Sequence, residues 1–178
     1  MDFTPDSTIN KLILLFVLDK MEIPLSDNSI MDICTSRNNW LNYMDCKDIL
    51  WQLLETNFIY KINGENNECR YAITLDGRDC LSHFYLRIPQ SLRENITNFC
   101  KENRMEFKRS QEYVSSYEKN PDGSHTVTLK IKEPMINSPL LEIKLKTPTR
   151  HSAILACKKW NEKAPNIFEY LYDGLIEN

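Results

Sequence analysis

The sequence contains few glycines and no glycine-rich phosphate loop. Only four of its 178 residues are Gly, at positions 64, 77, 123 and 174, and no two of them are close together. Loops that cradle nucleotide phosphates need several neighbouring glycines, because the backbone itself must approach the phosphate oxygens. We therefore expect no nucleotide bound in this way.

Patterns typical of catalytic and metal sites are also lacking. The three histidines, His83, His125 and His151, have no Ser, Asp or Cys near them at a spacing known from catalytic motifs. The six cysteines are scattered and form no C-x-x-C pair, which is typical of reduced thiols that pack as small apolar side chains. We expect no enzymatic activity, no cofactor and no metal centre.

No apolar run approaches the ~20 residues that cross a bilayer. The longest, Leu12 to Leu18, is followed at once by Asp19 and Lys20. The first residues, MDFTPDST, have neither the basic start nor the small-residue cleavage site of a secretion signal. The 42% of hydrophobic and 26% of charged residues are typical of a globular protein, which we expect to be cytoplasmic, with no membrane partner.

Positive charge is scarce in the first half of the chain. Residues 1–80 hold 7 Lys and Arg against 13 Asp and Glu, whereas residues 81–178 hold 15 against 12. Nucleic-acid affinity comes largely from cations that neutralise phosphates. The imbalance therefore bears directly on any DNA-binding role of the N-terminal part.

A capped helix is predicted to begin at Asp45. Asp48 lies at its third position, and Met44 and Ile49 have the spacing of a hydrophobic staple. The helical period gives it a buried stripe, Ile49, Leu50, Leu53 and Leu54, and an outward face, Lys47, Asp48, Trp51, Gln52 and Glu55.

A β-hairpin and a further helix follow. Residues 58–62 and 70–75 alternate as two short strands do, and the polar residues 63–69 between them form a loop. Thr74 has the position of a cap for the next helix. Helix, hairpin and helix in this order are typical of the second half of a winged helix, in which the loop is called the wing.

Two more helices are predicted before this stretch. An apolar stripe at helical spacing marks the first, over Ser7 to Lys20, and Ser26 caps the second, with Leu25 and Ile30 as its staple. Three residues are expected to anchor the loop that follows: Trp40, Leu41 and Tyr43.

The second half of the chain changes character. A domain joint is predicted at Ile88-Pro89, followed by a helix from Ser91 to Ser110. Three alternating strands then form a meander. Thr149 caps a helix that Pro165 breaks or kinks, and a last helical stripe follows. The fold class is thus α+β: a winged helix over 1–88, then a linking helix and a small domain over 89–178, with a three-stranded antiparallel sheet and two helices.

Several segments together resemble a known family. They are NKLILLFVLDKMEIPLS, LNYMDCKDILWQLLETNFI, RYAITLDGRDCLSHFYLRIPQSLRENI and the late ACKKW, and the likeness covers nearly the whole chain. The chain is similar to a bacterial family of unknown function, found mainly in anaerobic Gram-positive organisms and described as winged-helix and transcriptional-regulator-like. The resemblance implies an N-terminal winged helix with a small αβ domain behind it, and it implies no catalytic residue.

A winged helix usually places its third helix in the major groove of DNA while the wing meets the backbone. Few cations are available here, since Lys47 is the only one on that helix and Glu65 and Glu68 lie in the wing. Phosphate contacts are expected from Lys47, Lys61 and Arg70, and base or backbone hydrogen bonds from amides. The expected DNA-binding residues are Lys47, Trp51, Gln52, Lys61, Asn63, Asn66 and Arg70.

Alternatives remain open at each of these features. The winged helix serves equally well as a protein-interaction or ligand-sensing module that binds no DNA. Trp51 is a candidate anchor for a partner, but packing against the Trp40 loop is the favoured interpretation. A second basic surface is predicted on the later sheet, from Lys130, Lys132, Lys144 and Lys146. A homodimer is expected, because the first helix and the Ser91–Ser110 helix carry more apolar surface than one winged helix needs.

Overall fold

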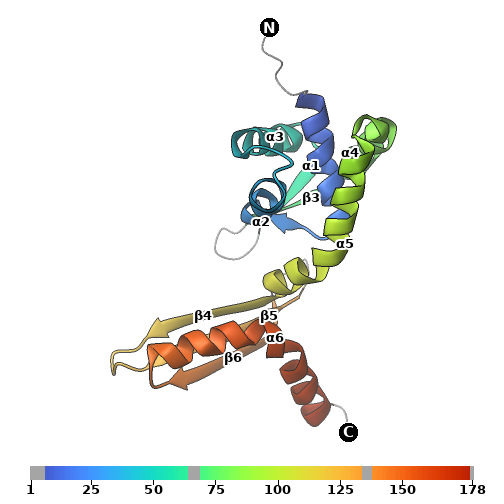
Figure 1. Ribbon diagram of the computed structural model, residues 1–178. Helices are drawn as coiled ribbons and strands as arrows, with labels where there is room; N and C mark the ends of the chain where they lie inside the picture. Colours follow the sequence, from blue (N-terminus) through green and yellow to red (C-terminus); the bar gives the residue numbers. More distant parts are fainter. Residues whose placement is uncertain (1–6, 64–68, 134–137, 177–178) are drawn as a thin grey trace. The chain divides into compact units, whose positions relative to one another are not determined.

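The computed structural model describes residues 7–63, 69–133 and 138–176. Helices and two antiparallel sheets of three strands each give an α+β fold, as the sequence predicts (Figure 1). The chain divides into two compact units, Met1–Met105 and Glu106–Asn178, and the division falls inside helix α5 (Gln90–Glu112). They are called the N-terminal and the C-terminal unit below.

The N-terminal unit alternates helices with short strands. In chain order its elements are α1 (Ser7–Met21), β1 (Leu25–Ser26), α2 (Asp27–Met31), the π-helical turn η1 (Asp32–Arg37), α3 (Tyr43–Glu55), β2 (Ile59–Asn63), β3 (Cys69–Ile73), α4 (Leu75–Phe84), η3 (Tyr85–Arg87) and most of α5. The sheet order is β1-β3-β2, with β3 in the centre and antiparallel to both neighbours.

Helix α1 forms the core of this unit. Every residue from Leu12 to Leu18 is buried, which is typical of a helix that is apolar all round. Arg104 of α5 fixes its end, donating to the Lys20 carbonyl at 2.7 Å and pairing with Glu22 at 2.6 Å. A homodimer is expected from the sequence partly because α1 carries much apolar surface. That argument is wrong for α1, because the N-terminal unit buries this surface itself.

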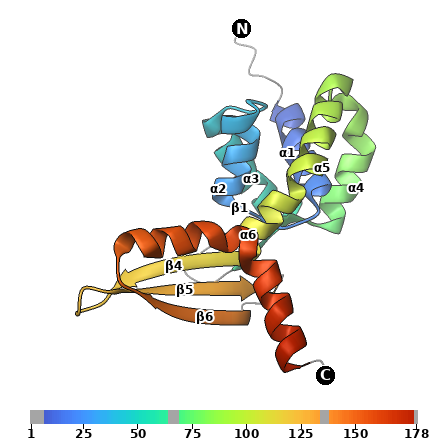
Figure 2. The same ribbon diagram turned by 60° about the horizontal axis from the view of Figure 1, so that its bottom comes forward.

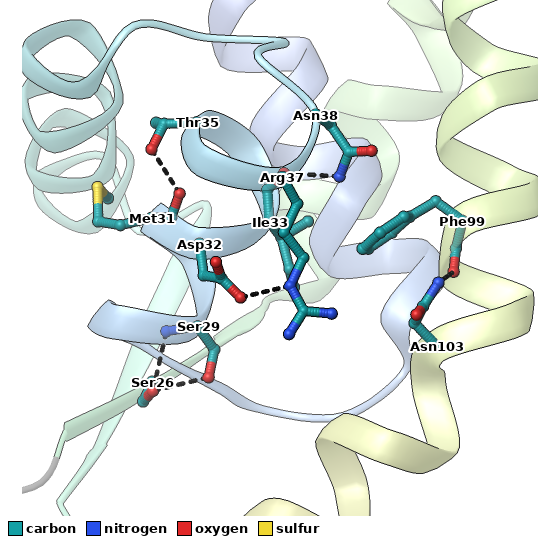
Figure 3. Close-up of polar contacts among 10 residues, drawn as sticks. All are labelled: Ser26, Ser29, Met31, Asp32, Ile33, Thr35, Arg37, Asn38, Phe99 and Asn103. Carbon is teal, nitrogen blue, oxygen red and sulfur yellow. Dashed lines mark hydrogen bonds and ion pairs between the residues drawn. The ribbon is translucent and has the colours of Figure 1, made fainter.

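Three of the predicted helix caps, Ser26, Thr74 and Thr149, are confirmed and one, Asp45, is wrong. Ser26 accepts a hydrogen bond from the Ser29 amide at 3.1 Å (Figure 3), and Thr74 accepts one from the Gly77 amide at 3.0 Å. Helix α3, however, begins before Asp45, because the Asn42 side chain caps it by accepting from the Asp45 amide at 2.8 Å. Met44 thus lies within the first turn, 68% exposed, and forms no staple.

The segment from α2 to η1 is closed by its own side chains (Figure 3). The Thr35 hydroxyl donates to the Met31 carbonyl at 2.6 Å, and the Asn38 amide donates to the Ile33 carbonyl at 2.8 Å. The Thr35 bond is the bond to the i−4 carbonyl that a threonine hydroxyl forms within a helical segment, and the Asn38 bond joins the residue after η1 back to the start of η1. The chain then turns into α3, so that α2 with η1 forms one helical segment and α3 forms the next.

The C-terminal unit is a three-stranded sheet with one long helix on one face (Figure 2). Its strands are β4 (Tyr113–Lys119), β5 (His125–Lys132) and β6 (Pro139–Thr147), in that order, and its helix is α6 (Arg150–Leu175). Val127, Leu129 and Ile131 alternate inward along β5, as predicted. They pack against α6, whose Trp160 donates its indole N–H to the Lys130 carbonyl at 3.1 Å.

Helix α6 runs without a break through Pro165. The prediction of two helices here is wrong, because the residues on both sides of the proline form a single helix that bends partway along its length (Figure 2). A proline removes one helical hydrogen bond and crowds the preceding turn, which bends a helix when packing holds both halves in place. The sequence also predicts a hairpin turn from Pro134 to Pro139 between the last two strands, and residues 134–137 of it lie outside the described residues.

Candidate nucleic-acid interface

The outer face of α3 is apolar and acidic. Met44 and Trp51 are 68% and 60% exposed, and Tyr43 is also exposed at the start of the helix. Asp48 and Glu55 lie on the same side and are exposed too. The opposite side of the helix is buried through Cys46, Ile49, Leu50 and Leu53. Asp48, Trp51 and Glu55 of the predicted outward face are thus exposed, whereas Lys47 and Gln52 are half-buried. The prediction that Tyr43 anchors the loop before the helix is wrong, because this side chain is 55% exposed.

The two tryptophans near this face have different surroundings. Trp40, in the loop before α3, packs edge-on against Phe99 of α5, with 5.6 Å between the ring centres. Trp51 projects from the middle of α3 and exposes most of its surface. The interpretation that Trp51 packs against the Trp40 loop is therefore wrong, and Trp51 is available for a ligand.

Lys47 forms an ion pair within the N-terminal unit. Its ammonium group forms a hydrogen-bonded ion pair with Asp27, the first residue of α2, and lies 5.8 Å from the ring centre of Tyr43. The hydrogen bond to Asp27 raises the pKa of Lys47 above its ordinary value. Both side chains are about one-third exposed, so a phosphate would have to compete with Asp27 for this ammonium group.

Gln52 lies beside Trp51 and is half-buried near the end of α3. Its backbone carbonyl accepts hydrogen bonds from Thr56, from the amide at 3.0 Å and from the hydroxyl at 2.9 Å. These bonds close the last turn and fix the backbone from which the Gln52 amide extends. An amide side chain at this place offers one donor and one acceptor to a ligand on the α3 face.

The hairpin places its two predicted phosphate-binding cations on opposite faces of the sheet. Lys61 of β2 is paired with Tyr71, on the same side as the buried pair Ile59 and Ile73, whereas Arg70 belongs to the alternate set. A hydrogen bond with Cys69 raises the pKa of Lys61. Asn63 ends β2, and Asn66 lies outside the described residues. The hairpin strands therefore do not bring Lys61 and Arg70 together.

Two buried thiols join η1 to α3 on the buried side of α3. Cys34 and Cys46 are fully buried and hydrogen-bonded to each other. That bond, together with burial, raises the pKa of Cys34. The same hydrogen bond lowers the pKa of Cys46. Burial raises the pKa of Cys100, on α5, to about 12. All three side chains are buried free thiols that pack in the core, as predicted. Within the described residues, no cluster of His, Cys, Asp and Glu has the geometry of a metal site.

The basic surface predicted on the second sheet carries its charges in pairs. Lys130 and Lys144 flank Glu142 at 3.2 and 3.4 Å, and Lys146 pairs with Asp122 at 2.6 Å. These ion pairs hold the pKa of both carboxyl groups below the ordinary range. The lysines do share the face of β5 and β6 away from α6, because they alternate with the buried residues. Much of their charge is nevertheless balanced locally.

Sequence reasoning missed the partner of Lys47. Asp27 is twenty positions away, and its only sequence signal was its place in the first turn of a helix capped by Ser26.

Within the residues that the structure describes, none of the helices is both long and apolar enough for a transmembrane span.

Residues 10–175 match the family model described as a domain of unknown function, DUF4364. This match covers almost the whole chain, so the protein belongs to that family. No curated protein matches it. No solved structure matches it either.

Proposed function

We propose that the N-terminal unit is a winged helix that binds double-stranded DNA, and that the protein is a transcriptional regulator acting as a homodimer. The order of its elements supports this: α1, β1, α2, α3 and the β2–β3 hairpin follow as in a winged helix, and β1 completes the small sheet at the free edge of β3. In that fold α3 is the helix that enters the major groove.

The observation that carries the proposal is the uncovered outer face of α3. The unit buries one side of the helix and leaves Met44, Trp51 and the flank with Gln52 open. Gln52 can pair with the N6 and N7 atoms of adenine, and the apolar side chains can contact thymine methyl groups. This chemistry reads bases with little help from positive charge.

The scarcity of cations shapes the expected binding. Lys47 is paired with Asp27, and the hairpin cations Lys61 and Arg70 lie on opposite sheet faces. Few phosphates are then neutralised, so few counterions are released on binding. Affinity should be modest and should depend only weakly on salt.

A second candidate function is a protein-interaction or ligand-sensing module without DNA binding. Asp48 and Glu55 favour it, because both carboxylates border the exposed Trp51 and would repel phosphates. An exposed tryptophan beside a methionine is also a typical anchor of a protein interface. In this alternative the same face of α3 docks a partner whose surface is apolar with a basic rim.

A DNA titration distinguishes the two candidates. Labelled genomic fragments, including the region upstream of the protein's own gene, are titrated by fluorescence anisotropy at low and moderate salt. We expect binding by the wild type, loss of binding for Lys47→Glu, and weaker sequence preference for Gln52→Ala. Lys158→Glu, with the same charge change on exposed α6, is the control. No binding at low salt would favour the interaction module instead.

A further inference from the structure

The apolar face of α6 extends beyond the sheet that it covers. Ala153, Trp160 and Ala164 bury the first part of this face against β4–β6. The same face continues along the helix with Phe168, half-buried, Tyr172, 42% exposed, and Leu175, 79% exposed. The later turns of α6 run past the edge of the sheet (Figure 2). The unit therefore leaves this last part of the stripe uncovered.

These turns are too apolar for a solvent-exposed helix. Residues 166–176, called the α6 tail below, contain seven aliphatic or aromatic side chains among eleven residues. Ile167 and Phe168 still pack against the core of the unit, whereas four of the others are exposed: Tyr170, Tyr172, Leu175 and Ile176. Phe168 and Tyr172 stack with 5.8 Å between their ring centres, and Tyr170 and Ile176 add exposed apolar surface on other sides. A helix that is apolar on most of its circumference is usually buried against another element.

A hollow of about 330 Å³ lies directly beside the tail. Its apolar wall is formed by Leu140, Ile131 and Tyr113, and it shares Phe168 with the stripe. Lys108 and Lys132 also line it, with Glu112. All of these residues belong to the C-terminal unit, so tail and hollow form one continuous surface.

Tail and hollow are complementary in charge. Between residues 164 and 176 the chain has Glu169 and Asp173 and no Lys or Arg. The hollow provides Lys108 and Lys132 beside its apolar wall. The ion pair of Lys108 with Glu112 is long, at 3.8 Å, and its side chain is substantially exposed, so this lysine can also meet an incoming carboxylate.

We propose that a second copy of this chain covers the tail, with apolar side chains of each tail inserted into the hollow of the other copy. In an interface around a twofold axis each contact occurs twice, so a chain that carries both the tail and the hollow on one surface can make both contacts at once. This inference gives the proposed homodimer its surface, and it does not depend on DNA binding.

Sedimentation velocity on the full-length chain over a concentration series tests the inference. The wild type should be dimeric at micromolar concentration, and Leu175→Lys should be monomeric, because it places a charge in the apolar contact. Leu175 is largely exposed, so this change spares the fold. Leu86→Lys is the matched control, since Leu86 is 81% exposed in the N-terminal unit, and it should remain dimeric.

A charge exchange tests the pairing of tail and hollow. Glu169→Lys and Lys108→Glu should each weaken dimerisation about tenfold, because each sets like charges against one another. The double variant should recover most of the wild-type affinity. Recovery would not occur if the tails merely associated through nonspecific apolar contact, and its absence would overturn the proposed arrangement.

The remaining outcomes are equally decisive. A wild type that stays monomeric at high micromolar concentration overturns the dimer, and slow amide exchange in the tail of that monomer would mean that its own chain covers it. A dimer that survives Leu175→Lys overturns this surface but keeps the proposed homodimer. A dimer that binds no DNA overturns the proposed DNA binding and leaves the present inference standing.

Discussion

Lys47, the only cation in the sequence of α3, is ion-paired with Asp27, the first residue of α2. The pair links α2 and α3, the two helices that would approach DNA in the proposed winged helix. The pair limits the contribution of Lys47 to DNA binding, because a phosphate can bind the Lys47 ammonium group only by displacing the Asp27 carboxylate. The pair therefore offers a direct means of changing the affinity of the proposed interface.

Removing the carboxylate should release the lysine. Asp27→Asn is expected to tighten DNA binding and to make log K fall more steeply with log salt, by about 0.9 for the one added phosphate contact. Fluorescence anisotropy at several salt concentrations measures both effects. Asp76→Asn is the control, because Asp76 also lies in the first turn of a helix, α4. Equal slopes for the two variants would show that Lys47 does not contact phosphate.

Gly77→Ala should destabilise the N-terminal unit strongly. A Cβ atom at this position would lie 2.1 Å from the Phe58 carbonyl oxygen and 2.9 Å from Ile73, and a backbone atom cannot move aside. Overpacking of this kind costs about 1–3 kcal/mol or more. Urea unfolding measures the change.

Gly174→Ala is the matched control for that substitution. Its added Cβ meets no atom within 4 Å, and alanine favours helix, so α6 should gain about 0.5–1 kcal/mol. A Gly77→Ala protein as stable as the wild type would contradict the close approach of α4 to the Phe58 carbonyl.

Stability should fall at alkaline pH because of Cys100. Burial raises the pKa of this thiol to about 12, whereas an unfolded cysteine ionises near pH 8.5. The unfolded state thus releases a proton that the folded state retains, so the free energy of unfolding decreases as pH rises between these two values, by at most about 1.4 kcal/mol per pH unit. Cys100→Ala should flatten this dependence in urea titrations from pH 8 to 10. An unchanged slope would assign the effect to other groups.

His125 should be replaceable by an apolar ring without loss. It is a buried polar residue at the start of β5, near Tyr117, and its Nδ1 atom is buried with no hydrogen-bond partner among the residues that the structure describes. An unsatisfied buried polar atom costs about 1–3 kcal/mol. His125→Phe should therefore raise the melting temperature of the C-terminal unit. A lower melting temperature would mean that the imidazole makes a necessary polar contact.

Local signals in the sequence predicted the elements well where they acted over a few residues. The caps Ser26 and Thr74 and the alternation of Val127, Leu129 and Ile131 depend on neighbouring side chains, and the structure confirms them. Asp45 was mistaken for a cap because Asn42, three positions earlier, satisfies the same preference. Of the two predicted effects of Pro165, the kink is present and the break is not, because Ile167 and Phe168 beyond the proline still pack against the core of the unit.

Long-range relations could not be predicted in the same way. The pairing of Lys47 with Asp27 and the packing of Trp40 on Phe99 join residues far apart in sequence. The burial of α1 on all sides was visible as an apolar run, but a run alone does not tell whether its own unit or a second chain covers it. The α6 tail shows the opposite case. Its apolar side chains recur with the same helical period as those of a buried helix, yet most of them are exposed.

Chemical-shift mapping by NMR tests the central claim, DNA binding through α3, most directly. Uniformly ¹⁵N-labelled protein is titrated at low salt with the fragment that binds best in anisotropy. We predict that the largest amide shifts fall in α3, around Lys47, Trp51 and Gln52, together with the Trp51 indole signal. Shifts confined to the outer face of β5 and β6, around Lys130 and Lys144, or no shifts at all, would contradict it.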